Sequence, residues 1–150
     1  VYKRQVHVLV DPQVTVSEGH MTGDRVLAQL KRDHPDIGDV RIHIDPEDDT
    51  HVANHVLLPD RTEMMRALEA EWAPVEAAQK IEKVNLHYLD GKIDVEVILP
   101  MGIAETLPES AAIAARISEA AERQEHVGKA SVLFDWRGSN LPDSEAATRH

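Results

Sequence analysis

Histidine is the residue type through which this sequence could do chemistry. Nine histidines are present, and six of them fall within the first 55 residues, at positions 7, 20, 34, 43, 51 and 55. His43 and Asp45 lie in an alternating segment, DVRIHID at residues 39–45, which predicts a strand. Side chains two residues apart on a strand project from the same sheet face. An imidazole and a carboxylate are therefore expected side by side.

His7 has the corresponding outward position on a second predicted strand, RQVHVLV at residues 4–10. If the two strands are neighbours, His7, His43 and Asp45 converge on one open sheet face. Imidazole nitrogen together with carboxylate oxygen suits zinc or a similar first-row divalent cation. The competing interpretation is an ordinary solvated polar face, because a His-x-Asp motif by itself is short.

The remaining histidines are weaker candidates. His20 lies in the first turn of a helix predicted to begin at Ser17 and to run to about residue 33. Such a helix should cover the opposite sheet face, so His20 could join the others only at an edge or across a dimer interface. His51 and His55 would share one face of a helix, but the residues between them do not dictate a helix. We interpret His87 and His126 as ordinary surface or edge histidines.

The composition excludes several other classes of function. The chain has 150 residues and a formal charge of −11, whereas a nucleic-acid-binding protein needs a basic stripe. There is no cysteine, so thiolate metal sites and disulfides are excluded. No apolar run approaches the roughly 20 residues that span a bilayer. Phosphate-binding glycine loops, nucleophile elbows and zinc-protease motifs are also missing, so we do not expect an enzyme.

The hydrophobic patterning predicts an α+β fold with two modules. After the first strand–helix–strand segment, helices are predicted from about residue 62 and from Pro108 to about Glu125, and strands at about 81–88, 92–99 and 129–135. Asp90-Gly91 predicts a tight hairpin between the first two of these strands. The order helix–strand–strand–helix–strand is typical of a ferredoxin-like two-layer plait, in which helices cover one sheet face.

An internal repeat relates the two halves. Residues 6–10 match residues 95–99, and residues 40–46 match residues 130–136. The first copy lacks a leading helix and strand, which we expect to lie before Val1. The predicted organisation, in order, is a partial metal-binding module over 1–50, a linker over 51–61, a ligand-poor module over 62–136, and a polar tail over 137–150.

The stretch from His7 to Asp48 resembles the cytoplasmic domain of cation diffusion facilitator transporters. The resemblance rests on four landmarks, which are His7 with Asp11-Pro12, His20, His34-Pro35, and His43-Ile44-Asp45-Pro46. It implies that His7, His20, His43 and Asp45 bind Zn²⁺ or another divalent transition-metal ion. It also implies a homodimer whose conformation responds to the cation, on the cytoplasmic side of an inner-membrane transporter. The partner would then be the transmembrane domain of the same full-length protein.

The second half resembles another copy of this domain with its ligands replaced. On this alignment His7 corresponds to Glu96, His20 to about Ser110, His43 to Leu133, and Asp45 to Asp135. We therefore expect a structural copy that serves as a packing or dimerisation partner. The family's six membrane helices, and a further ligand histidine on the preceding strand, have no counterpart in this sequence.

The alternative to a metal-binding transporter domain is a plait that senses a small molecule and has no metal role.

Overall fold

The computed structural model describes residues 4–48 and 57–136, which form two compact units. The first unit holds β1 (Arg4–Leu9), α1 (Val16–Asp33) and β2 (Val40–Asp45), together with residues 89–91. The second unit holds the other elements, from α2 (Arg61–Trp72) to β5 (Val127–Asp135). His51 and His55, most of the predicted linker and the predicted tail lie outside the described residues. Each unit is described by itself.

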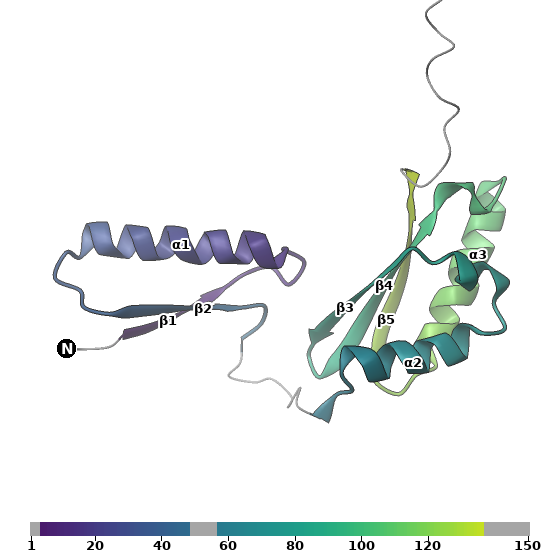
Figure 1. The fold of residues 1–150 in the computed structure, drawn as a ribbon, viewed down its shortest axis with the longest axis horizontal. Coiled ribbons are helices and arrows are strands. Elements are labelled where there is room, and N and C mark those ends of the chain that lie inside the picture. Colours follow the sequence, from purple (N-terminus) through teal and green to yellow (C-terminus); the bar gives the residue numbers. More distant parts are fainter. Residues whose placement is uncertain (1–3, 49–56, 137–150) are drawn as a thin grey trace, which may run out of the picture. The chain divides into compact units, whose positions relative to one another are not determined.

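The first unit is a strand–helix–strand unit with parallel strands. It consists of β1 (Arg4–Leu9), α1 (Val16–Asp33) and β2 (Val40–Asp45). The two strands pair directly, with Val6 opposite Ile42 and His7 opposite His43. Helix α1 runs along one face of this pair (Figure 1). The opposite face carries the outward side chains of both strands.

Local sequence signals explain where α1 begins and ends. The Thr15 hydroxyl accepts a hydrogen bond from the backbone N–H of Glu18 at 3.2 Å, which satisfies one of the free donors of the first turn. At the other end the N–H of His34 bonds to the Leu30 carbonyl, and Pro35 follows. A residue that precedes proline avoids the α region, so the helix stops there.

The first unit buries little apolar surface. Its strand residues facing α1 are half-buried, apart from Val40, which is 8% exposed. Helix and strand approach closely because Gly19 and Gly23 face β2. A Cβ atom at Gly23 would lie 3.2 Å from Cδ1 of Ile44. This close approach brings α1 against the inner sheet face, leaving the outer face uncovered by the helix.

The second unit contains a three-stranded sheet in the order β3-β4-β5. Its main elements, in chain order, are α2 (Arg61–Trp72), β3 (Lys83–Leu89), β4 (Lys92–Pro100), α3 (Leu107–Glu122) and β5 (Val127–Asp135). Short 3₁₀ helices cover Glu76–Lys80 and Met101–Ile103. The predicted hairpin turn is present, with Asp90 and Gly91 at φ 49° and 70°. Positive φ at both positions is what a two-residue turn of this kind requires.

The second unit has a closed hydrophobic core. Alternate residues of β4 point inward and are at most 1% exposed, namely Ile93, Val95, Val97 and Leu99. Both helices pack on this sheet face, since Leu68 of α2 and Ile117 of α3 belong to the same cluster. The indole N–H of Trp72 donates to the Ile117 carbonyl at 3.1 Å and links the two helices. Capping boxes at Asp60/Glu63 and Thr106/Glu109 fix the helix starts.

The structure confirms the mixed α+β class and the predicted order of elements, and it corrects three boundaries. Strand β3 begins at Lys83 rather than at about residue 81. Helix α3 ends at Glu122 rather than at about Glu125, because residues 124–127 form a turn in which the Val127 N–H bonds to the Gln124 carbonyl. Strand β5 consequently begins at Val127, two residues earlier than predicted. Within residues 4–48 and 57–136, no helix is long and apolar enough to cross a membrane.

The core of the second unit yields a stability prediction. Leu68 is fully buried, so Leu68→Ala should lower the free energy of unfolding by about 2–5 kcal/mol through lost burial and a residual cavity. Urea unfolding followed by circular dichroism measures this. Leu107→Ala is the matched control, because Leu107 is 80% exposed and should change stability by less than about 0.5 kcal/mol. Equal losses in both variants would contradict the assigned core.

Candidate metal-binding site

The outer face of the first unit brings two histidines into contact. His7 and His43 are cross-strand partners in β1 and β2, and both side chains are exposed. Their rings stack with centroids 5.1 Å apart and an interplanar angle of 22°. The strand pairing therefore produces the neighbouring imidazoles that the sequence suggested, on the face that α1 does not cover.

Asp45 completes this arrangement through His7. Its Oδ2 lies 2.6 Å from Nδ1 of His7, and its side chain is 18% exposed compared with 55% for His7. The Gln5 side-chain nitrogen lies 3.0 Å from Nε2 of His7. If the Gln5 amide donates to Nε2, the neutral imidazole carries its proton on Nδ1 and donates it to Asp45.

This geometry gives Asp45 a particular chemical role. Metal-binding histidines commonly donate their second ring N–H to a carboxylate, which orients the ring and increases its basicity. In the first unit, Asp45 can orient His7 in this way, and Nε2 becomes available to a cation once the Gln5 amide turns away from it. Asp45 can therefore act as the carboxylate that orients His7, as a metal ligand through its other oxygen, or as both.

The described residues do not by themselves form a complete metal site. Within residues 4–48 and 57–136, no group of three or more histidine or acidic side chains is close enough to hold a metal ion. A zinc ion takes four ligands in structural sites. The donor chemistry of His7, His43 and Asp45 fits such a cation, and the remaining ligands must come from elsewhere.

His20 is not part of this arrangement within one chain. It is exposed on α1 and lies 3.6 Å from the carboxylate of Asp24, one helical turn away. The adjacent Gly19 faces Ile44 on the inner side of the sheet. His20 therefore belongs to the helix layer, whereas His7 and His43 lie on the outer face.

Two residues near the histidines were missed by the sequence analysis. Gln5 and Arg41 are cross-strand partners on the same outer face, one alternation away from His7 and His43. The two-residue strand period was sufficient to place them there. Arg41 adds a positive charge beside His43, which works against cation binding unless the guanidinium turns away.

In the second unit, the strand positions that the predicted repeat matches to His7 and His43 carry other residue types. Ile98 pairs with Leu133, and Glu96 pairs with Ser131. Because His7 pairs with His43, the predicted equivalences of His7 with Glu96 and of His43 with Leu133 cannot both hold. If Leu133 corresponds to His43, the strand register assigns Ile98 to the position of His7. An apolar pair then replaces the two imidazoles.

His87 lies on the edge strand β3, in keeping with the surface or edge position expected from sequence, but part of its ring is buried. It is half-buried on β3, and its Nε2 is buried without a hydrogen-bond partner in the described part of the chain. Its neighbour Tyr88 donates a hydrogen bond to the Pro59 carbonyl at 3.1 Å. Burial raises the pKa of the Tyr88 phenol, and the nearby Asp60 carboxylate raises it further.

Comparisons with known proteins agree with the first unit's sequence pattern. Residues 4–47 match the family model described as "Cation efflux protein, cytoplasmic domain". The chain is also similar to metal tolerance protein C1 of Arabidopsis thaliana, with 28% identity over 107 residues. That match covers 64% of this chain and 23% of the relative, so the chain spans less than a quarter of the relative's length. No solved structure matches.

The two matches differ in extent. A match over 64% of the chain is more than twice as long as residues 4–47, so it continues past the first unit. The family model, in contrast, begins with β1 and ends just after β2. The segment that carries His7, His20, His43 and Asp45 thus lies within the match to the cytoplasmic domain of cation efflux proteins.

Proposed function

We propose that this chain is a cytoplasmic regulatory part of a divalent-cation efflux transporter, and that its first unit binds zinc or a similar divalent ion. The stacked pair of His7 and His43, with Asp45 bonded to His7, carries this proposal. The family match to residues 4–47 supports the transporter context. In this role the chain regulates transport and performs no catalysis.

The site requires more than one copy of the chain. His7, His43 and Asp45 form the outer-face ligand set, and His20 joins as a fourth ligand from a second copy. In support, His20 is exposed and lies in the helix layer of its own chain, away from the other three. Two chains of charge −11 repel each other, and a bridging cation offsets that repulsion. Cation binding then favours the associated state, because the complete site exists only there.

The second unit serves as a ligand-poor partner module. We infer that the chain contains two tandem, related ferredoxin-like plaits, over 1–50 and 62–136, of which the first is N-terminally incomplete. The shared strand–helix–strand order with parallel pairing supports this relationship. On the open face of the second sheet, Leu133 is 48% exposed and stands opposite Ile98. An apolar pair there suits packing against another subunit better than binding a cation.

The transporter context extends beyond this chain. The relative in Arabidopsis thaliana is named as a metal tolerance protein and is more than four times as long as the matched segment. We propose that the chain acts together with a transmembrane transporter domain of the same full-length protein. The domain would lie on the cytoplasmic side of the membrane.

A small-molecule sensor is the second candidate function. A groove of about 410 Å³ lies in the second unit between α2 and the start of β3. Its lining combines apolar side chains with charged ones, including Met65, Trp72, Arg61 and Glu69. Pockets of this size accept small ligands. A sensor of this kind would show no stabilisation by zinc, whereas metal binding by imidazoles should weaken as the pH falls from about 7 to about 5.

Zinc should raise the thermal midpoint of the chain, and His43→Ala should largely remove that effect. Zinc at 100 times its dissociation constant adds about 2.7 kcal/mol to stability, which corresponds to several degrees. Differential scanning calorimetry with and without zinc measures the shift. His34→Ala is the matched control, since His34 is exposed in the same unit but lies at the end of α1. An equal zinc response in the parent and in His43→Ala would refute the site.

Zinc should also increase self-association, and His20→Ala should abolish this response while leaving residual zinc binding. The reason is that His20 reaches the outer-face ligands only from another copy. Sedimentation velocity and small-angle scattering, with and without zinc, measure the mass and the radius. Asp24→Asn is the control, because it removes the His20 ion-pair partner but keeps the imidazole. An unchanged mass in parent and variant alike would show that any bound metal stays within one subunit.

A further inference from the structure

The outermost ridge of α1 has an unusual charge pattern. Met21, Arg25, Ala28 and Arg32 follow one another at helical spacing and are all exposed. The opposite side of the helix, with Gly19 and Gly23, packs against β2. The ridge is therefore the part of α1 that points furthest from the sheet, and it contains two guanidinium groups and no carboxylate.

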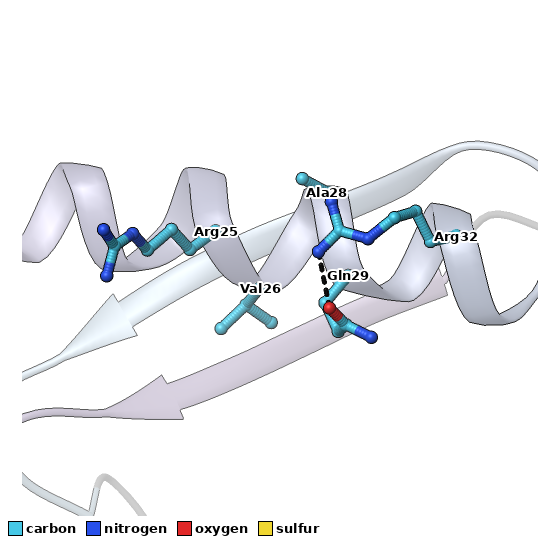
Figure 2. Close-up of a pocket in the computed structure, with 5 residues that line it drawn as sticks. All are labelled: Arg25, Val26, Ala28, Gln29 and Arg32. Carbon is cyan, nitrogen blue, oxygen red and sulfur yellow. Dashed lines mark hydrogen bonds between the residues drawn. The ribbon is translucent and has the colours of Figure 1, made fainter.

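The two arginines border an open groove on the helix surface. Its volume is about 540 Å³, and it is lined by Arg25, Val26, Ala28, Gln29 and Arg32. Figure 2 shows Arg25 and Arg32 on either side of Ala28, with Gln29 close to the Arg32 guanidinium. Two helical turns separate the arginines, which is about 10 Å along the axis. The Arg32 side chain runs back along the helix toward Ala28, and the Arg25 side chain points away from Ala28.

Among residues 4–48 and 57–136, no carboxylate forms an ion pair with Arg25 or Arg32. Arg32 donates a hydrogen bond to the neutral amide of Gln29, and Arg25 has no acceptor within the described residues. The nearest carboxylates are otherwise engaged, since Asp24 faces His20 and Asp33 accepts both hydrogen bonds from Gln29 at 2.8 Å. Lys31 adds a third exposed cation beside the ridge.

The concentration of cations is notable because the first unit is acidic. Residues 4–48 contain nine aspartates and glutamates but five lysines and arginines, and three of those five lie between positions 25 and 32 of α1. A solvated helix face in an acidic protein is expected to mix both signs. An unpaired cationic ridge is the arrangement that an anionic ligand requires.

We propose that the α1 ridge binds phosphate groups, with the guanidinium groups of Arg25 and Arg32 as the principal donors. Arginine presents its N–H groups as a planar fork that matches two phosphate oxygens, and this makes it the preferred residue for such groups. The exposed thioether of Met21, 48% accessible, offers an apolar contact next to the charges. The phosphate belongs either to a lipid headgroup or to a free phosphate compound. This ridge shares no residue with the candidate metal site.

Two binding measurements on the full chain test the proposal. In the first, the chain is sedimented with vesicles of phosphatidylcholine containing or lacking phosphatidylglycerol, whose phosphate is its only charge. In the second, inorganic pyrophosphate is titrated and the amide signals of α1 are followed by NMR. The test variant is Arg25→Gln/Arg32→Gln. Its matched control is Arg66→Gln/Arg116→Gln, which removes the same charge from exposed positions on α2 and α3.

Each outcome bears on the proposal directly. If the ridge binds headgroups, the test variant should lose at least about tenfold in partitioning to the anionic vesicles, while the control stays within about twofold of the parent. If it binds free phosphate, pyrophosphate should shift the signals around Arg25 and Arg32 in the parent and control only, without vesicle binding. Failure of both ligands to bind, or equal losses in variant and control, would overturn the proposal. His43→Ala should leave both readouts unchanged. A failure of the metal-site proposal can therefore be told apart from a failure of the ridge proposal.

Discussion

The parallel pairing of β1 with β2 is the constraint on which the candidate site depends. It sets His7 directly opposite His43, and the strand alternation directs both imidazoles away from α1. A register shift of one residue would turn one histidine toward the helix layer and separate the pair. The position of Asp45 follows from the same register, because it lies diagonally across from His7 and reaches its Nδ1 at 2.6 Å. The close approach of α1 through Gly19 and Gly23 holds the inner face in place and so stabilises this register.

Much of the fold could be predicted from the sequence because its signals are local. The alternation of valine and isoleucine marks the strands, Pro35 ends α1, and Asp90-Gly91 forms the hairpin turn. Boundaries were less predictable where tertiary contacts decide them, as at the end of α3. The strand register of the second unit was also not predictable, because pattern matching aligns single strands and says nothing about which residues face each other. That is why the sequence matched both Glu96 to His7 and Leu133 to His43, although β4 and β5 pair Glu96 with Ser131 and Ile98 with Leu133.

The candidate site was predictable in its composition but not in its detail. The two-residue period was sufficient to group His7, His43 and Asp45 on one face, and the covering helix was sufficient to exclude His20 from that face within one chain. The sequence could not distinguish a carboxylate that binds a metal from one that orients a histidine, since this depends on which oxygen and nitrogen atoms meet. It also gave no warning of the buried Nε2 of His87, because the burial of a single ring atom depends on the packing around it.

The two units divide the physical tasks of the chain. The second unit contains the buried core, whereas the first unit has half-buried strands and carries its histidines on an open sheet face.

The central claim is that this open face binds a divalent ion through imidazole nitrogen. The most direct measurement is NMR of the ¹⁵N-labelled imidazoles during a zinc titration. The account predicts that Nε2 of His7 and a ring nitrogen of His43 shift together at stoichiometric zinc, while Nδ1 of His7 keeps the proton that it donates to Asp45. Zinc-dependent shifts confined to other histidines, or no shift at any histidine, would contradict it.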